Sequence, residues 1–478
     1  MVGYFYGDNG GHMAARDYIF FELTNSICST CFRKLEAKII FQNDRVYMTK
    51  TCPDHGKEKV LISTDIAYYK KTRDFNKPGD MPRKFGMKVE RGCPYDCGLC
   101  SDHEQHSCVS IIELTDRCNL TCPTCYAASS PSHGRHRTLG EIERMLDIVV
   151  ASEGEPDVVQ LSGGEPTLHP DFFTVMDMAK ARPIRHLMIN TNGIRIARDI
   201  AFVERLSGYM PGVEVYLQFD SFEAEALISL RGEDLRATRA QALEHLNRFN
   251  ISTTLVVTLQ KGLNDHEIGA ILAFARTQRC VRGVTFQPTQ VAGRLEHFDP
   301  ARDRITLSEV RQSILDQSDI FIPEDLVPVP CHPDAIMMGY ALKLGDEIVP
   351  LTRYFSPEEL LATSRNTVNF ETMPEVHYKL IKLFSTGNSP QDCTDTIADI
   401  MCCLPQVATD GAFGTLTYAN LFRVIVMKFY DAHDFDVRGV KKTCVHIVHK
   451  DGRIIPFDTM NLFYRDPVVE QKLMESVR

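Results

Sequence analysis

The sequence has no apolar run of the ~18–20 residues that a bilayer-spanning helix needs. It also lacks a long basic block, and Lys plus Arg number 53 against 63 for Asp plus Glu, which gives a formal net charge of −10. Nucleic acid is therefore not expected as a partner. Residues 1–18 show no basic start followed by an apolar stretch, so we expect no secretory signal. These absences predict a cytoplasmic protein, and 478 residues are enough for two or three domains.

Sixteen cysteines are present, and ten of them lie in the first 125 residues. Without a secretion signal, metal binding explains this density better than disulfides do. The most informative run is TDRCNLTCPTCYA, in which Cys118, Cys122 and Cys125 have C-x3-C-x2-C spacing. Three thiolates can hold three irons of a 4Fe–4S cluster and leave the fourth iron for a small molecule. A zinc site or a plain ferredoxin cluster is the alternative for this run alone.

Strand-like and helix-like segments alternate from about residue 110 to residue 295. The expected strands are 110–114, 157–161, 186–190, 214–220, 253–260 and 283–288. Helices are expected from Thr138, where Glu141 completes a capping box, from Pro170, and over 196–206, 237–246 and 265–276. This order predicts an α/β fold with a parallel sheet and right-handed crossovers. Six such units form a partial (β/α)6 barrel of the TIM type, and an open doubly wound sheet is the structural alternative.

Polar and glycine-rich segments follow the expected strands at their carboxyl ends, where sites lie in such folds. The cysteine run follows the first strand, and SGGEP follows the second. The two glycines of SGGEP let backbone approach closely, where a side chain would collide. The candidate residues at these strand ends are Gly163, Gly164, Glu165, Pro166, Asn190, Asn192, Gln218, Asp220, Ser221, Gln260 and Arg294.

The cysteine spacing, the aromatic Tyr126 after it, and GGEP after the next strand together resemble the radical S-adenosylmethionine (SAM) superfamily. The resemblance implies that SAM chelates the open iron and that one electron from the cluster cleaves it to a 5′-deoxyadenosyl radical. It implies cofactor-binding roles for Tyr126 and the strand-end candidates, with Glu165 near the SAM ammonium. It also implies an oxygen-sensitive enzyme that needs an electron donor such as ferredoxin or flavodoxin.

A second triple lies upstream in RGCPYDCGLC, with Cys93, Cys97 and Cys100, and Cys108 follows shortly after. Four thiolates would close a 4Fe–4S cluster, which relays electrons but has no iron free for SAM. We therefore predict an auxiliary cluster in residues 76–109. The alternatives are a structural zinc and a second radical site with Cys108 unligated, although no GGEP-like partner serves the latter.

Residues 1–75 contain CSTC, with Cys28 and Cys31, and CPDHG, with Cys52 and His55. This C-x2-C…C-x2-H pattern is typical of a zinc ribbon or of a rubredoxin-like iron, and spacing alone leaves both metals open. The segment AKIIFQNDRVYMTK between the halves predicts a hairpin. So small a unit buries little core, so we expect the metal to supply its stability.

Residues 110–298 are assigned to the barrel, and residues 299–478 are expected to form a C-terminal α+β domain. CVHIVHKDGRIIPF predicts a hairpin that turns at Asp451-Gly452. A further cluster is predicted in this domain. Its expected ligands are Cys331, Cys402, Cys403 and Cys444, with His332 and Cys393 as substitutes.

The order of these motifs, with LVVTLQKGLNDHEIG, FQPTQVAGR and VPCHPD, resembles over nearly the whole chain a radical SAM group that includes archaeal tetraether lipid synthases (GDGT/MAS synthases). This resemblance implies a lipid-biosynthesis transferase that joins alkyl chains by C–C bonds, with peripheral contact at the inner face of the membrane. The group was also associated with methylation of pterins. A radical SAM methylase of a soluble, small-molecule heterocycle is therefore the alternative, and an electron carrier without SAM cleavage is a third hypothesis.

Overall fold

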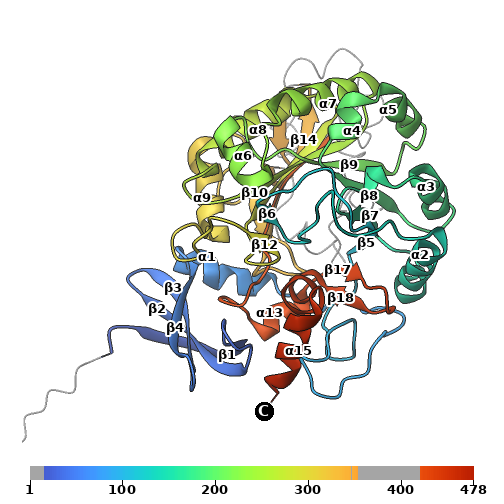
Figure 1. Ribbon diagram of the computed structural model, residues 1–478. Helices are drawn as coiled ribbons and strands as arrows, with labels where there is room; N and C mark the ends of the chain where they lie inside the picture. The colour runs from blue at the N-terminus through green and yellow to red at the C-terminus, as the bar shows by residue number, and fades with distance from the viewer. Residues whose placement is uncertain (1–15, 346, 354–419, 478) are drawn as a thin grey trace, which may run out of the picture.

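The computed structural model describes residues 16–345, 347–353 and 420–477 (Figure 1). A 4-stranded sheet near the N-terminus lies beside a 12-stranded sheet that curves around the centre of the molecule. A two-stranded pair, β12 (Arg294–Leu295) with β6 (Thr124–Cys125), completes the strands. The predicted α/β class with an N-terminal metal-binding region is confirmed.

The N-terminal sheet is an antiparallel meander. Its strands are β1 (Ile19–Ile27), β2 (Lys34–Gln42), β3 (Arg45–Cys52) and β4 (Gly56–Ser63). The predicted hairpin is β2 and β3, which turn at Asn43 and Asp44. Both of these residues have positive φ, 51° and 56°. Two such residues are what a tight hairpin turn needs to match the twist of its strands.

An uninterrupted run of parallel strands forms the barrel, and it contains all six predicted strands. They are β5 (Val109–Thr115), β7 (Val158–Gly163), β8 (His186–Thr191), β9 (Val213–Gln218), β10 (Thr253–Leu259) and β11 (Val281–Pro288). The C-terminal segment adds a parallel strand at each edge. β16 (Leu421–Met427) pairs with β11, and β17 (Val445–Val448) pairs with β5. Among the described residues the parallel run therefore has eight strands where the sequence predicted six.

Antiparallel strands extend this sheet at both ends. They are β13 (Leu326–Pro328), β14 (Ile336–Leu344) and β15 (Glu347–Pro350) beyond β16, and β18 (Ile454–Pro456) beyond β17. The β17–β18 hairpin turns at the predicted Asp451-Gly452. Because the sheet continues past residue 298, the C-terminal segment shares one sheet with the barrel.

Helices cover the outer face of the barrel (Figure 1). They are α2 (Leu139–Glu153), α3 (Phe172–Lys180), α4 (Ile194–Arg198), α5 (Ile200–Ser207), α7 (Arg236–Phe249), α8 (Ile268–Thr277) and α9 (Leu307–Gln317). The helix α6 (Ala224–Arg231) packs instead against the cysteine run, where its Leu227 shares a buried cluster with Leu120 and Cys122. The capping box at Thr138 and Glu141 is present. The helix predicted over 196–206 is two helices, because the Asp199 side chain caps a new start. No helix in the described ranges has the length and apolar content that crossing a membrane requires.

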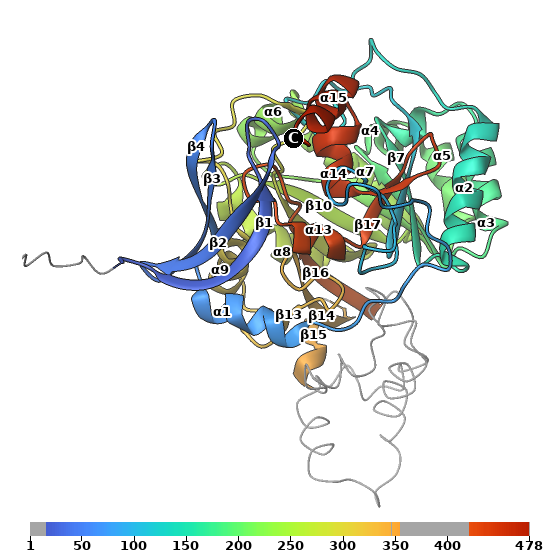
Figure 2. The same ribbon diagram turned by 90° about the horizontal axis from the view of Figure 1, so that it is seen from below.

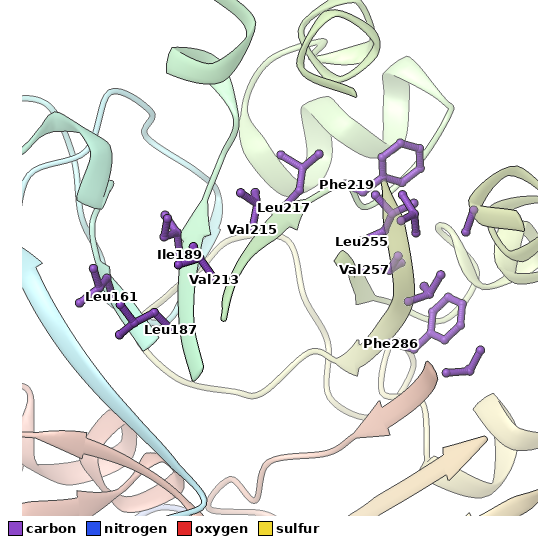
Figure 3. Packing of buried hydrophobic residues seen from close by; sticks show 14 of the residues in the cluster. Leu161, Leu187, Ile189, Val213, Val215, Leu217, Phe219, Leu255, Val257 and Phe286 are labelled. Carbon is purple, nitrogen blue, oxygen red and sulfur yellow. The ribbon is translucent and has the colours of Figure 1, made fainter. Parts of the chain in front are cut away.

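The core of the barrel lies between the strands and these helices. Alternate residues of a strand point to opposite faces, and Figure 3 shows the outward set, such as Leu187, Val215 and Leu255. These outward side chains are fully or almost fully buried. The inward set, such as Glu214 and Thr254, lines a cavity instead. The outward face of the strands therefore forms the core, and the inward face lines the cavity.

The N-terminal sheet rests on the C-terminal segment, as Figure 2 shows for β1 and α13 (Val437–Lys442). The Thr24 hydroxyl donates to the Asp436 carboxylate at 2.6 Å. The buried Lys50 ammonium donates to the carbonyls of Ala432 and His433 at 2.8 and 2.9 Å. The remaining elements near this junction are α1 (Ile66–Lys71), α14 (Phe457–Thr459), the π-helical turn Met460–Tyr464 and α15 (Pro467–Glu475).

Gly283 allows β16 to approach β11, because a Cβ there would lie 2.4 Å from the carbonyl oxygen of Arg423. We expect Gly283→Ala to lower the free energy of unfolding by roughly 1–3 kcal/mol, as overpacking does elsewhere. Gly86→Ala is the matched control, since nothing lies within 4 Å of its added Cβ. Denaturant unfolding of both variants measures the difference, and equal midpoints would contradict the prediction.

Candidate active site and metal centres

A cavity of about 230 Å³ lies inside the barrel. At one end it is lined by the cysteine run and by residues at the carboxyl ends of the strands. At the other end it reaches His186, Glu214 and Arg423, near the amino ends of β8, β9 and β16. The predicted strand-end site and the barrel interior therefore form one continuous space.

Cys118, Cys122 and Cys125 all line this cavity. Cys118 and Cys122 lie on the loop between β5 and β6, and Cys125 lies in β6. Burial raises the pKa of the Cys118 thiol to about 12 and also raises that of Cys122, so metal binding must drive their deprotonation. The three sulfurs do not all lie within 4.8 Å of one another, as ligands of a single ion do. Because the thiolates of a cluster bind different irons, this wider spacing fits a 4Fe–4S cluster.

Arg294 stabilises the cysteine loop through hydrogen bonds to its backbone. Its side chain donates to the carbonyl oxygens of Cys122 at 2.6 Å and Ser129 at 2.7 Å. Its backbone is in β12, which pairs with Cys125 in β6. Arg294 was predicted to bind the cofactor, but its side chain is not among the described groups that line the cavity. Its hydrogen bonds position the loop, and its role in cofactor binding stays a prediction.

Gly163 and Gly164 bring backbone against the cysteine loop. A Cβ on Gly163, whose φ is +126°, would lie 2.2 Å from the Thr115 carbonyl oxygen. A Cβ on Gly164 would lie 2.1 Å from the carbonyl oxygen of Arg117. Both glycines line the cavity, so a small molecule can approach their backbone, as predicted. Pro166 is buried outside this lining and begins a short 3₁₀ turn.

The Glu165 carboxylate connects the loops after β7 and β8. It accepts hydrogen bonds from the backbone N–H groups of Thr167 at 3.1 Å and Asn192 at 2.8 Å, and from the Thr191 hydroxyl at 2.8 Å. Burial raises its pKa above the ordinary value despite these donors. Both oxygens are thus engaged within the protein. A direct bond from Glu165 to the SAM ammonium stays a prediction.

A hydrogen-bonded array crosses the strand ends below the cysteines. Gln218 donates to Asn190 at 2.8 Å, and Asn190 donates to the Ser162 hydroxyl at 3.2 Å. Arg231 donates to Gln218 at 2.9 Å and forms two bonds, of 2.7 and 2.6 Å, with Asp220. Burial alone would lower the pKa of Arg231, but Asp220 raises it overall, so the guanidinium stays charged.

Arg231 lines the cavity and was missed from the sequence. The available signal was Asp220, because a buried carboxylate at a strand end needs a cation nearby. Asp220 is fully buried and acts through Arg231, and the Ser221 hydroxyl donates to Glu267. Gln260 lies beyond β10. None of Asp220, Ser221 and Gln260 is among the described residues that line the cavity, whereas Asn190, Asn192 and Gln218 are.

Tyr126 lines the cavity beside the last cysteine. Its ring contacts that of Phe457 edge to face at 5.0 Å, and the Arg465 guanidinium lies 5.4 Å from its centroid. Burial raises the pKa of Tyr126 to about 12, so the phenol stays protonated. Its position in the site agrees with the predicted role in cofactor binding, which remains a prediction.

The second triple, Cys93, Cys97 and Cys100, lines a separate small cavity together with Asp102 and His103. Cys108 does not line it. The structure therefore gives no support to Cys108 as the fourth ligand of this triple.

Cys108 lies with Cys331 and Cys444, and their sulfurs are all within 4.8 Å of one another. The Cys331 and Cys444 sulfurs are 3.3 Å apart. The cause is strand register: Val109 pairs with Val445, so the cysteine before each strand stands beside the other. The spacing of the cysteines in the sequence favoured grouping Cys108 with Cys93, Cys97 and Cys100. It could not show that β5 pairs with β17.

The other predicted members of the C-terminal group, Cys393, Cys402 and Cys403, lie outside the described residues. The imidazole of His332 follows Cys331 directly. It is buried, and neither ring nitrogen has a hydrogen-bond partner in the described part of the chain. His332 does not belong to the group whose ligand atoms all lie within 4.8 Å of one another, so its role as a substitute ligand stays a prediction. The imidazole that lies against the group is that of His106, whose Nε2 is 3.5 Å from the Cys108 sulfur.

Cys28, Cys31, Cys52 and His55 converge as predicted. The Cys31 and Cys52 sulfurs are 3.8 Å apart, and His55 Nδ1 lies 3.6 Å from the Cys28 sulfur and 3.4 Å from the Cys52 sulfur. Two Zn–S bonds of ~2.3 Å at a tetrahedral angle place their sulfurs about 3.8 Å apart. The four groups therefore fit a single tetrahedral ion.

Comparison with known proteins gave two family matches. Residues 112–275 match the radical SAM superfamily, and residues 20–64 match the HMPTM N-terminal zinc ribbon domain. The chain is 29% identical over 486 residues to 7,8-dihydro-6-hydroxymethylpterin dimethyltransferase of Methanocaldococcus jannaschii, covering 94% of this chain and 95% of that protein.

Two further likenesses are partial. The chain is 31% identical over 175 residues to GTP 3′,8-cyclase of Edwardsiella ictaluri, covering 34% of this chain and 50% of that protein. The crystal structure of Streptococcus suis SuiB bound to S-adenosylmethionine is 16% identical, with a TM-score of 0.36, over 44% of this chain and 47% of that one.

The regrouping of Cys108 can be tested by metal analysis. We expect Cys108→Ser to alter the same metal centre as Cys331→Ser and a different one from Cys93→Ser. The measurement is iron, zinc and sulfide content with electron paramagnetic resonance of each reconstituted variant. Cys280→Ser is the control, because this buried cysteine belongs to none of the described groups. A Cys108→Ser spectrum matching that of Cys93→Ser would restore the sequence prediction.

The position of Arg231 predicts a role in holding SAM. Arg231→Lys keeps the charge but loses the planar fork that spans Asp220 and Gln218. We expect SAM to bind about tenfold more weakly while iron content stays unchanged, because two charge-assisted contacts are disturbed. Equilibrium SAM binding to the reconstituted protein measures this. Arg236→Lys, at an exposed pair with Asp234, should bind SAM like the wild type. Equal SAM affinities of the wild type, Arg231→Lys and Arg236→Lys would contradict the role of Arg231 in holding SAM.

Proposed function

The chain carries a radical SAM domain over residues 112–275, and from this premise we propose that it is a radical SAM methyltransferase acting on a pterin-like heterocycle. The observation that carries the proposal is a set of polar and charged side chains that face the cavity inside the barrel, at the end away from the cysteine run. The likeness to a pterin dimethyltransferase over nearly the whole of both chains supports it. Both favour the alternative drawn from the sequence over the joining of lipid chains.

Polar and apolar side chains both face the cavity. The apolar ones include Val158, Met188 and Ile425. Polar side chains come from five different strands, and they are Gln160, His186, Glu214, Thr254 and Arg423. A bound alkyl chain would cover these groups and return no hydrogen bonds, which is costly for polar and charged groups. A heterocycle with ring nitrogens and a carbonyl can bond to them. The lining therefore suits a polar ring better than a lipid tail.

When bound, the cluster and SAM supply the reductive cleavage that gives a 5′-deoxyadenosyl radical. The protein's own part is to hold the reactants in place and keep water out. The backbone at Gly163 and Gly164 receives SAM beside the cysteine loop, and Arg231 and Gln218 hold its polar groups at the strand ends. The substrate then lies deeper in the barrel, between SAM and the amino ends of the strands. An external one-electron donor is required.

The relatives reported above give no support to a lipid substrate or to membrane contact, which the sequence first suggested. Location in the cytoplasm remains a prediction. The choice between the two substrate classes is therefore left to product analysis.

Anaerobic turnover tests the proposal. With dithionite, SAM and 6-hydroxymethyl-7,8-dihydropterin, we expect pterin-dependent 5′-deoxyadenosine and S-adenosylhomocysteine, together with a pterin heavier by one or two methyl groups. Cys122→Ala should abolish all three products because the cluster loses a ligand. Mass spectrometry reads the products. A parallel reaction with lipid extract is the competing arm, and cross-linked lipid with an unchanged pterin would sink the methyltransferase proposal.

A further inference from the structure

Four side chains form a polar group at the amino end of the barrel, far from the cysteine loop. We call His186, Glu214, Thr254 and Arg423 the floor group. Glu214 accepts a hydrogen bond from Arg423 at 2.9 Å, and His186 Nε2 lies 3.2 Å from the same carboxylate oxygen. The Thr254 hydroxyl donates to the other oxygen. All four line the cavity.

The register of the sheet brings these residues together. Glu214 stands opposite Met188, one inward position above His186, and Thr254 stands opposite Tyr216, one inward position above Glu214. Arg423 pairs with Gly283 on the intervening strand β11. Because Gly283 has no side chain, the Arg423 side chain can extend across the lumen to Glu214.

A purely structural role does not account well for this group. Buried ion pairs are often no more stabilising than apolar side chains of the same volume, because both charges must leave water. The outward residues of the same strands are apolar and pack under the helices. The floor group instead faces the open cavity. This position favours recognition of a polar ligand.

The charge state of the floor group fits such a role. Burial raises the pKa of Glu214, but Arg423 and His186 lower it overall, so the carboxylate is ionised at neutral pH. An ionised carboxylate accepts hydrogen bonds, and the guanidinium beside it only donates. The floor therefore presents an acceptor and a donor side by side, both held in place by their mutual contact.

The distance to the radical end is suitable for a fused ring system. Glu214 precedes Gln218 by four residues along β9, which is about 13 Å at ~3.3 Å per residue. Gln218 belongs to the array around Arg231 beneath the cysteine loop. A two-ring heterocycle anchored at the floor would extend its far carbon atoms toward the site proposed for SAM.

We propose that the floor group recognises the 2-amino-4-oxo edge of a pterin-like ring. Glu214 accepts from the ring N–H and the exocyclic amine, and Arg423 donates to the neighbouring carbonyl. His186 and Thr254 orient the carboxylate. This proposal rests on the proposed function, because it names the groups that select the heterocycle.

Equilibrium binding of oxidised 6-hydroxymethylpterin to the reconstituted protein with SAM provides the test. The fluorescence of the pterin itself can be followed, since the chain has no tryptophan to obscure it. We expect Glu214→Gln to raise the Kd about tenfold to a hundredfold, which is the usual range for losing a hydrogen bond to a charged group.

Glu22→Gln is the matched control. Its carboxylate also pairs with two cations, Arg73 and Arg438, but on the N-terminal sheet away from the cavity. Its Kd for the pterin should equal that of the wild type. A second comparison needs no variant: the 2,4-dioxopteridine, which lacks the 2-amino group, should bind wild-type protein about tenfold or more weakly. This comparison of two pteridines on the wild-type protein tests the floor-group proposal even if Glu214→Gln does not fold.

The outcomes separate the two proposals. Equal Kd values for wild type and Glu214→Gln, or for the two pteridines on wild type, would overturn the floor-group proposal and leave methyl transfer standing. Glu214-dependent binding with no methylated product would instead remove the proposed reaction and leave recognition intact. Absence of pterin binding to the wild type would overturn both.

Discussion

Side chains alternate between two faces along every strand of the parallel run, and the two faces have opposite chemical character. The outward row is aliphatic and aromatic (Figure 3), and it packs under helices α2 to α5, α7 and α8, where it is shielded from water. Because that row supplies the core, the inward row is free to carry charges and amides that would be costly in a packed interior. The strand β9, VEVYLQ, shows this in six residues: Val213, Val215 and Leu217 stabilise the fold, whereas Glu214, Tyr216 and Gln218 face the cavity. The site therefore depends on a register that the core fixes.

The C-terminal segment supports both the barrel and the metal centres. β16 carries Arg423 into the lumen, and β17 brings Cys444 beside Cys108 through its pairing with β5. Cys444 also lines the large cavity, so the Cys108–Cys331–Cys444 group lies next to the amino end of the substrate space. The pairing of β17 with β5 therefore both extends the parallel run and brings Cys444 next to Cys108. The N-terminal sheet is fixed to the same segment by hydrogen bonds from Lys50 to Ala432 and from Thr24 to Asp436, between β16 and β17.

Local patterns in the sequence predicted much of this architecture. The capping box at Thr138, the six strands, the two hairpins and the convergence of Cys28, Cys31, Cys52 and His55 all depend on residues near one another in the chain. The edge strands β16 and β17 were not predicted as part of the barrel, because their partners lie more than a hundred residues away. For the same reason Cys108 was grouped with its nearest cysteines. Arg231 was missed because no motif includes it, although the buried Asp220 required a cation.

The sequence motifs indicate the cofactor, whereas the side chains that line the barrel interior bear on the substrate. The cysteine run, the glycine pair and the strand-end amides are explained by the cofactor, and they would be needed whatever the substrate. His186 in HLMIN and Glu214 in EVYLQ are not explained by the cofactor, since both lie at the opposite end of the cavity. Their alternation with apolar residues was visible in the sequence, and it predicts a polar interior once a closed sheet is assumed. A lipid tail requires no such row, whereas a heterocycle with donors and acceptors does. The proposed choice of a heterocyclic substrate therefore rests on the polar residues of the inward row.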